Sequence, residues 1–343
     1  MSRTARGSRV TLDDVAVRAD VSPVTVSRVL RDPDRVSEPL RKRVDAAVRE
    51  LGYIPNQMAS ALASARTGRV AVIVPSLTNG VFDDYLRATH DIFLPAGIDV
   101  LVLNSNYASG REEQAIVTAL GQHPEAIILA GIEQTAFAKR SLRQAAIPIV
   151  QTMDISPDPI DINIGLSHFD AGYAAARHLF DLGHRNVGYV AAPLDSRARK
   201  RSAGYLHAVH EFGAMPAIAS VDDPSSVTLG GSLFVDLIER APATTAVFCA
   251  NDDLALGVLF ECRRRGIRVP DDMSIIGFND LEFSASASPS LSTVATPRYE
   301  VARRAAEIIL DIVRGSGKRP LPRQIDLGFR VIGRESTAPP TGG

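Results

Sequence analysis

The chain has 343 residues, 45% of them hydrophobic and 22% charged, which predicts a globular protein of two or three domains. No apolar run reaches the roughly 18 residues needed to cross a bilayer, and the basic start MSRTARGSRV leads into no apolar signal segment, so we expect a cytoplasmic protein. The two cysteines, Cys249 and Cys262, are too few for a disulfide framework or a cysteine metal cluster, and their apolar or helical surroundings are typical of buried thiols.

The net charge of −1 conceals an uneven distribution along the chain. Residues 1–69 hold 13 Lys and Arg against 8 Asp and Glu, whereas the remainder holds 25 against 31. A basic head on an acidic body indicates an anionic partner for the head alone. A chance excess on a small domain would give the same count.

The head, residues 10–55, contains three predicted helices after an arm, residues 1–9, that we expect to be disordered. Thr11 can cap the first helix, which has an apolar face of Leu12, Val15, Ala16 and Ala19. Ser22 can cap the second, with Pro23 at its first position, where the missing N–H costs nothing. The third runs from Ser37 to Leu51 and stops at Gly52.

The second helix has one apolar side and one polar side. Val26, Val29 and Leu30 point inward at helical spacing, and five residues are left facing out: Pro23, Val24, Thr25, Ser27 and Arg28. Two short helices joined by a tight turn, the second with exposed hydroxyls and an arginine, describe a helix-turn-helix that enters a DNA major groove. Arg28 suits a guanine, Val24 a thymine methyl, and the two hydroxyls suit phosphates. A small helical interaction domain is the alternative.

The segments TLDDVAVRADVSPVTVSRVL and VSEPLRKRVDAAVRELGYIPN resemble the DNA-binding head of the LacI/GalR family of transcriptional regulators. The resemblance implies that residues 56–69 form a hinge helix and linker, in which Leu62 is wedged into the operator minor groove. An ordinary packing leucine in an Ala-rich linker is the alternative for Leu62. The expected DNA contacts are Thr11, Ser22, Pro23, Val24, Thr25, Ser27, Arg28, Asn56, Ala59 and Leu62.

Pro23 and Val24 stand where many relatives carry polar or aromatic base readers, so the operator sequence of a relative does not transfer to this chain. Two-fold operators need two heads, which implies a homodimer. The amphipathic segment 298–314 is a candidate interface helix, although packing on its own sheet explains it nearly as well.

From residue 70 onward, short apolar runs alternate with helix-length amphipathic stretches. RVAVIVP, IDVLVLN, EAIILAG and IPIVQT form one set, and RNVGYVA, TTAVFCAN and MSIIGFND form a second. This alternation predicts two doubly wound parallel-sheet subdomains, with ligands at the carboxyl ends of the strands. No GxGxxG, P-loop, zinc or nucleophile-elbow motif occurs, so we expect no cofactor, no metal and no enzyme activity.

The body also resembles the periplasmic-binding-protein-like body of the same family. PSLTNGVF, VFCANDDLALGVLFECRRRGIRVPDDMSIIGF and QIDLGFRVIGRES are similar to the gluconate-utilisation repressors within it. We therefore expect an effector-binding and dimerisation domain at 70–335. Its first subdomain covers about 70–165 and 295–325, and its second covers 166–294 and 326–335. The end, STAPPTGG at 336–343, reads as a disordered tail.

The resemblance implies an effector pocket for a polyhydroxylated ligand, with Arg201 as a clamp that suits a carboxylate. The expected residues are Thr78, Asn79, Phe82, Asp154, Phe169, Arg201, Asn251 and Asn279. Plainer roles are open for several: Asn251 as a helix cap, Asp154 as a loop acceptor, Arg201 in a solvated charged run, Asn279 as a turn residue. His168 and Phe169 replace an Asp-Asn pair of many relatives, which argues against assuming a neutral sugar and offers Phe169 as an aromatic wall.

These expectations describe a transcriptional repressor of carbohydrate uptake and catabolism genes that is released from DNA when a sugar or sugar acid closes the two subdomains. A corepressor-activated regulator is an alternative of the same class. A transport-type sugar-binding protein is an alternative of another class, as is an α/β enzyme that uses Asp154 or Asp280.

Overall fold

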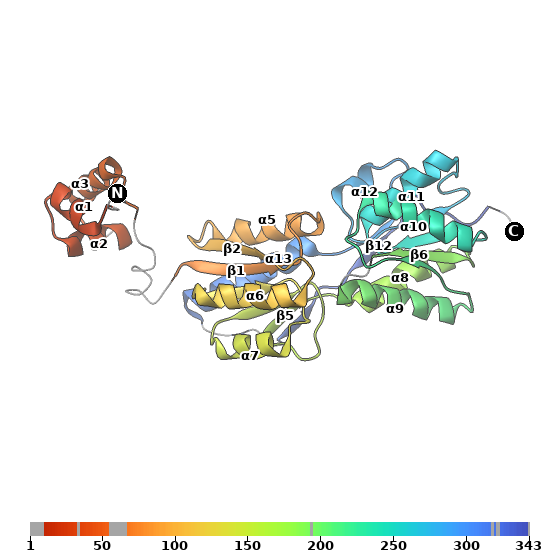
Figure 1. Cartoon of the computed structure of the whole chain (residues 1–343), viewed down its shortest axis with the longest axis horizontal. Helices are drawn as coiled ribbons and strands as arrows, with labels where there is room; N and C mark the ends of the chain where they lie inside the picture. The colour runs from red at the N-terminus through yellow and green to blue at the C-terminus, as the bar shows by residue number, and fades with distance from the viewer. Residues whose placement is uncertain are drawn as a thin grey trace, which may run out of the picture. The chain divides into compact units, whose positions relative to one another are not determined.

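A computed structural model of the chain describes residues 10–32, 35–54, 67–192, 195–316, 319 and 323–341 (Figure 1). The expected arm, and the expected hinge contacts Asn56, Ala59 and Leu62, lie outside the described residues. The chain divides into two units, Met1–Gly68 and Arg69–Gly343.

The N-terminal unit contains three helices, α1 (Leu12–Ala19), α2 (Pro23–Arg31) and α3 (Glu38–Leu51). Helix α1 begins with a capping box, in which the Thr11 hydroxyl accepts from the Asp14 N–H and the Asp14 carboxylate accepts from the Thr11 N–H. Gly52 ends α3 in the left-handed conformation at φ 63°, which costs glycine nothing.

The apolar faces of these helices meet in one small core. The expected inward residues of α2, Val26 and Val29, are buried, and Leu30 is half-buried. The Nε–H of Arg18 donates to Glu50 Oε1 at 2.9 Å, which ties α1 to α3. The fully buried members are Val15, Ala16, Ala19, Val26, Val29, Val44 and Ala47.

The first subdomain of the body is built on a six-stranded parallel sheet in the order β11-β5-β4-β3-β1-β2. Its central strands are buried along their whole length on both faces, as expected from their apolar runs. The strands are β1 (Arg69–Val74), β2 (Asp99–Asn104), β3 (Ala126–Leu129), β4 (Ile149–Thr152), β5 (Ile162–Gly165) and β11 (Gln324–Asp326).

Two pairs of helices cover the two faces of this sheet. Helices α5 (Val81–Phe93) and α13 (Arg298–Asp311) share one apolar core, and α6 (Ser109–Gly121) and α7 (Ala136–Gln144) share the other. A short π-helical segment, Ile312–Ser316, follows α13. The apolar face of α13 packs on α5 and the sheet. The amphipathic pattern of segment 298–314 is therefore explained by packing within its own subdomain, the alternative to an interface helix.

The second subdomain has a four-stranded parallel sheet in the order β7-β6-β8-β9 and an antiparallel pair, β10-β12. Helices α8 and α9 pack against each other, as do α10 and α11 (Figure 1). The strands are β6 (Val187–Ala191), β7 (Ala217–Ser220), β8 (Ala246–Cys249), β9 (Ser274–Ile276), β10 (Thr293–Ala295) and β12 (Arg330–Ile332). The helices are α8 (His168–Asp181), α9 (Ser196–Glu211), α10 (Val227–Arg240), α11 (Asp252–Arg265) and the short α12 (Glu282–Ser286).

The chain passes between the two subdomains three times, at 165–168, 295–298 and 326–330. The strands of both sheets therefore direct their carboxyl ends toward the boundary between the subdomains. Cys249 and Cys262 are both free and buried in the core of the second subdomain, as expected.

The expectation of a disordered tail at 336–343 is wrong for residues 336–341. Ser336 is fully buried, and its backbone and hydroxyl bond to Ile275 on strand β9. Ala338 O accepts from His184 at 2.9 Å, and the Thr341 hydroxyl donates to Asp271 O. These hydrogen bonds to strand β9 and to the loops at His184 and Asp271 hold a Pro-rich segment whose composition alone suggests disorder. No helix among the described residues is long and apolar enough to span a membrane.

Candidate functional site

The outward side of α2 presents the residues expected to contact DNA. Pro23, Val24, Ser27 and Arg28 are exposed, and the Val24 side chain is 69% accessible despite being apolar. Arg28 forms no ion pair with another described residue. An exposed valine beside an exposed guanidinium and small hydroxyls gives this helix face the mixture of groups that contacts base edges and phosphates.

The small polar residues of the head serve first as helix caps. Ser22 Oγ lies 2.8 Å from Thr25 Oγ1 and accepts from the Thr25 N–H, which fixes the start of α2. The backbone N–H and the hydroxyl of Thr11 both donate to Asp14 Oδ2, at 2.8 and 2.7 Å, and hold the pKa of Asp14 below the usual value. These caps set the direction in which the exposed face of α2 is presented.

The body contains a cavity of about 340 Å³ at the carboxyl ends of the strands, where loops of both subdomains converge. Six of the eight expected effector residues line this cavity: Thr78, Asn79, Phe82, Arg201, Asn251 and Asn279. The two exceptions are Asp154 and Phe169.

The loop after β1 provides one wall of the cavity. The Ser76 hydroxyl accepts from the backbone N–H groups of Thr78 and Asn79, both at 3.1 Å, which folds the loop tightly. Asn79 Oδ1 accepts from the Val81 N–H, and Asn79 Nδ2 donates to the Tyr107 hydroxyl at 3.1 Å. The loop therefore fixes polar groups toward the cavity beside the ring of Phe82.

Two asparagines face the cavity from the second subdomain. Asn251 Oδ1 accepts from the Leu254 N–H at 2.9 Å and so caps α11, which leaves its amide N–H groups for a ligand. Asn279 adopts φ 115°, a strained conformation for a residue other than glycine, and its carbonyl accepts from Arg298. Both asparagines combine a structural role with a place on the cavity wall.

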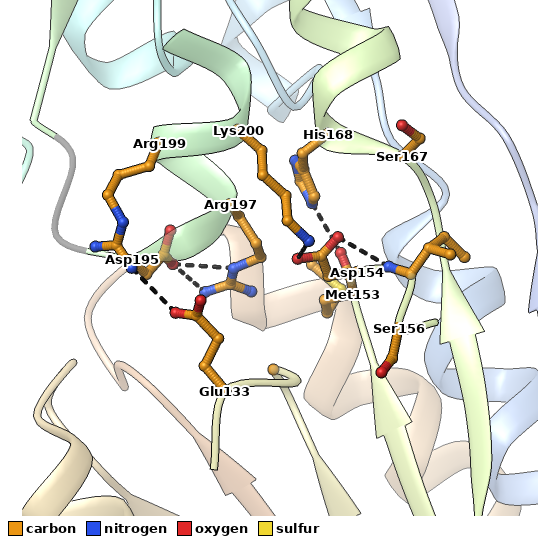
Figure 2. Close-up of polar contacts among 12 residues, drawn as sticks. Glu133, Met153, Asp154, Ser156, Ser167, His168, Asp195, Arg197, Arg199 and Lys200 are labelled. Carbon is orange, nitrogen blue, oxygen red and sulfur yellow. Dashed lines mark hydrogen bonds and ion pairs between the residues drawn. The ribbon is translucent and has the colours of Figure 1, made fainter. Parts of the chain in front are cut away.

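Tyr107, Asp195 and Arg197 also line the cavity, although the sequence pattern did not single them out as ligand contacts. Asp195 caps α9 and pairs with Arg197, which is only 7% accessible (Figure 2). Burial opposes ionisation of Asp195, but Arg197 and Arg201 hold its pKa well below the usual value. The sequence hinted at Arg197 through the charged run of Arg197, Arg199, Lys200 and Arg201, and gave no such signal for Tyr107.

Arg201 lies on α9 with its guanidinium over the ring of Phe278, 4.5 Å from the ring centroid. Its NH1 lies 3.2 Å from His168 Nδ1. None of the ion pairs among the described residues includes Arg201, and its Nε–H has no hydrogen-bond acceptor there. Burial lowers the pKa of Arg201, with Asp195 opposing that shift.

The structure does not bring Asp154 into the cavity as a ligand contact. The Asp154 side chain is 1% accessible and pairs with Lys200 Nζ at 2.7 Å, while the Ile155 N–H donates to its other oxygen (Figure 2). Lys200 belongs to the second subdomain, so this ion pair joins the two subdomains. A second cross-pair, Arg199 with Glu133 at 3.0 Å, lies nearby and is exposed (Figure 2).

The expectation that Phe169 forms an aromatic wall is also not met. Phe169 is 37% accessible and packs against His207 on the outer side of α8 and α9, with ring centroids 5.6 Å apart. Its neighbour His168 faces the cavity in its place. One residue along a helix turns the side chain by about 100°, so the inward position falls on His168.

The cavity offers hydroxyl, amide, guanidinium and carboxylate groups, a set that suits a small polyhydroxylated ligand. Asp253 lines the cavity near the start of α11, and burial raises the pKa of its carboxyl. The described residues contain no cluster of three His, Cys, Asp or Glu that could hold a metal ion. Asp154 and Asp280, the carboxylates considered for an enzyme, are both held in ion pairs, with Lys200 and Arg334.

A helical DNA-reading head joined to an α/β body with a polar cavity defines a ligand-responsive DNA-binding regulator. Residues 11–56 match the family model for bacterial regulatory proteins of the lacI family, and residues 176–337 match that for a periplasmic binding protein-like domain.

Known proteins agree with this class over nearly the whole chain. The HTH-type transcriptional regulator GntR of Pseudomonas aeruginosa is 42% identical over 336 residues, which cover 97% of each chain. The crystal structure of a LacI-family regulator from Silicibacter pomeroyi superposes with a TM-score of 0.89 at 34% identity, covering 95% of this chain and 99% of that one. The lac repressor dimer bound to operator gives a TM-score of 0.80 at 26% identity, covering 96% and 100%.

The chain therefore belongs to the LacI family of bacterial transcriptional regulators. It is a DNA-binding regulator controlled by a sugar or sugar-acid effector, and its homologues are regulators rather than enzymes. The alternatives of a transport-type binding protein and of an α/β enzyme are thereby set aside.

Proposed function

We propose that this regulator is a repressor whose effector is a gluconate-like sugar acid, and that it controls genes of carbohydrate uptake and catabolism in the cytoplasm. The observation that carries the proposal is Arg201, a guanidinium that faces the cavity and has no carboxylate partner among the described residues. A planar guanidinium fork matches a carboxylate in two parallel hydrogen bonds. The similarity to regulators named GntR adds support.

The rest of the cavity supports a ligand of this size and polarity. Its volume of about 340 Å³ is at the small end of the range for small-molecule sites and suits a single sugar unit. Asn79, Asn251 and Asp253 can accept from or donate to ligand hydroxyls, while Phe82 covers an apolar edge of the carbon chain. The sugar acid in this proposal lies with its carboxylate on Arg201 and its hydroxyls on these groups.

We propose that two heads of a homodimer read a two-fold operator. In each head α2 lies in a major groove, with Arg28 on a guanine, Val24 on a thymine methyl, and Thr25 and Ser27 on phosphates. The exposure of this face and the excess of basic residues in 1–69 support the assignment. For residues 56–69 the proposal retains the hinge role, with contacts from Asn56, Ala59 and Leu62.

Effector binding is coupled to the head through the arrangement of the two subdomains in this proposal. The ligand contacts residues of both subdomains, and the ion pairs of Lys200 and Arg199 already bridge them from α9. A ligand changes an equilibrium only through its different affinity for two states, so the proposed effector favours the closed body and disfavours the DNA-bound hinge.

A thermal-shift panel of paired sugars and sugar acids tests the proposed effector. D-gluconate is expected to stabilise the purified chain, and neutral sugars are not. A ligand that binds only the folded state adds about 2.7 kcal/mol of stability at 100 times its Kd. A panel in which glucose, ribose or other neutral sugars stabilise the chain and no aldonate does would overturn the proposal. The same samples in a salt-dependent DNA gel shift check that the head remains functional.

A further inference from the structure

His168 connects the effector-facing arginine to the opposite subdomain. Its side chain is 3% accessible, and Nε2 lies 2.8 Å from Met153 O after strand β4 (Figure 2). On the other side of the ring, Nδ1 lies 3.2 Å from Arg201 NH1. A backbone carbonyl only accepts, so Nε2 carries the proton and donates to Met153 O. Nδ1 is then an acceptor, and the guanidinium of Arg201 donates to it. The imidazole is therefore neutral, with one fixed tautomer.

Two glycines allow helices α8 and α9 to approach closely enough for this contact. Helices α8 and α9 approach so closely that a Cβ at Gly172 would lie 2.5 Å from Arg201 O, and one at Gly204 would lie 2.2 Å from Phe169 O. The ring of His168 also stacks on Phe278 at 5.7 Å between centroids, the same ring that lies under Arg201. The imidazole and the guanidinium therefore share one rigid aromatic support and cannot move apart easily.

The charges around this pair leave Arg201 without a direct ion-pair partner among the described residues, although Asp195 acts on it at longer range. From α9, Asp195 is committed to Arg197, and the groups that face His168 from that helix are mainly these two arginines. Burial, followed by Arg201 and Arg197, lowers the pKa of His168 well below its usual value, so the ring stays neutral near pH 7. Asp253 lines the cavity from α11 and forms no ion pair with another described residue. The cavity thus has a cationic end at Arg201 and an acceptor at Asp253.

We propose that His168 determines the charge specificity of the site: a neutral acceptor at this position orients Arg201 without neutralising it, so that the effector itself must supply the anion. A carboxylate at position 168 would form an ion pair with Arg201 in place of the contact with His168 Nδ1. It would neutralise the guanidinium that is proposed to bind the ligand's carboxylate. This inference rests on the proposed sugar-acid effector and names the residue that selects acid over neutral sugar.

The test compares D-gluconate with D-gluconamide, its neutral amide, by calorimetric titration of the full chain. The wild type is expected to prefer gluconate by about 100-fold, as for a buried pair with a charged group. His168→Asp is expected to reduce gluconate affinity by about 100-fold and leave gluconamide affinity within about threefold, which abolishes the preference. His168→Asn stays neutral, keeps an acceptor and is expected to retain most of the preference.

His184→Asn is the matched control, because His184 is another buried histidine with two hydrogen bonds, to Thr245 and Ala338 O, and does not line the cavity. It is expected to leave both affinities unchanged. If the wild type prefers gluconate and His168→Asp keeps that preference, the proposed role of His168 is contradicted, while the proposed effector is still supported. A wild type with no preference for the acid over its amide overturns both. Loss of both ligands in His168→Asn, with an unchanged unfolding transition, also contradicts a role confined to charge selection.

Discussion

The buried ion pair between Lys200 and Asp154 makes a quantitative prediction for the body. Asp154 is 1% accessible, and Lys200→Met leaves its carboxylate with only the Ile155 N–H as a hydrogen-bond partner. Breaking a buried pair typically costs 3–5 kcal/mol, and Lys200 is 37% accessible, which favours the lower end, about 3 kcal/mol. The unfolding midpoint is expected to fall by roughly 6–10 °C.

The stability lost in Lys200→Met is expected to depend on pH because burial raises the pKa of Asp154 in the folded chain. Between the unfolded value of about 3.9 and the folded value, the folded state binds more protons, so stability falls as pH rises through that window. Without Lys200 the pKa of Asp154 in the folded chain rises further. The stability of Lys200→Met is therefore expected to be closer to that of the wild type at pH 5 than at pH 7.5.

The assay is urea unfolding of the wild type, Lys200→Met, Asp154→Asn and the double variant at both pH values. Adding Asp154→Asn to Lys200→Met is expected to recover about 2 kcal/mol, since no unpaired charge remains. Arg199→Met is the matched control: its pair with Glu133 joins the same subdomains but is exposed, so about 0–1 kcal/mol is expected. A loss in Lys200→Met that is equal at both pH values and unrelieved by Asp154→Asn would refute the reasoning.

Three further substitutions separate the functions of the chain. Arg201→Ala is expected to abolish the thermal shift from a sugar acid and to leave DNA binding intact, because Arg201 lines the cavity and is not part of the head; equal loss of both would indicate misfolding. Arg28→Ala is expected to weaken DNA binding by about 1–3 kcal/mol and to leave effector binding unchanged, as measured by fluorescence anisotropy and calorimetry. Gly172→Ala forces a methyl against the backbone of Arg201 and is expected to destabilise the body by about 1–3 kcal/mol in urea unfolding, whereas a neutral effect would contradict the close packing of α8 on α9.

The local signals of the sequence predicted the head well. Caps at Thr11 and Ser22, the stop at Gly52 and the inward face of α2 depend on neighbours a few residues away, and the structure places each as expected. The buried strands of the body follow from the same kind of local signal. A short continuous run of β-branched residues is typical of a strand that is buried on both faces of a parallel sheet. The capping role of Asn251 was recognisable from the same local signals, whereas its place in the cavity was expected only from the family resemblance.

The cavity was predictable only in part, because its remaining residues depend on contacts between distant segments. His168 and Phe169 are adjacent in the sequence, and the phase of α8, which the pattern did not fix, decides that the histidine faces the cavity. Asp154 is taken out of the cavity by Lys200, 46 residues away. The packed end of the chain is a similar case, since Ser336 bonds to Ile275 across 61 residues.

The central claim is the coupling between the cavity and DNA, and one titration tests it most directly. A two-fold duplex is selected from a random library by the full chain, and its affinity is measured by fluorescence anisotropy with and without saturating D-gluconate at fixed salt. The account predicts that the sugar acid weakens binding by about 5–150-fold, a coupling of about 1–3 kcal/mol, and that Arg201→Ala removes the response. An unchanged affinity for the duplex, under conditions where calorimetry shows the cavity saturated with D-gluconate, would contradict it.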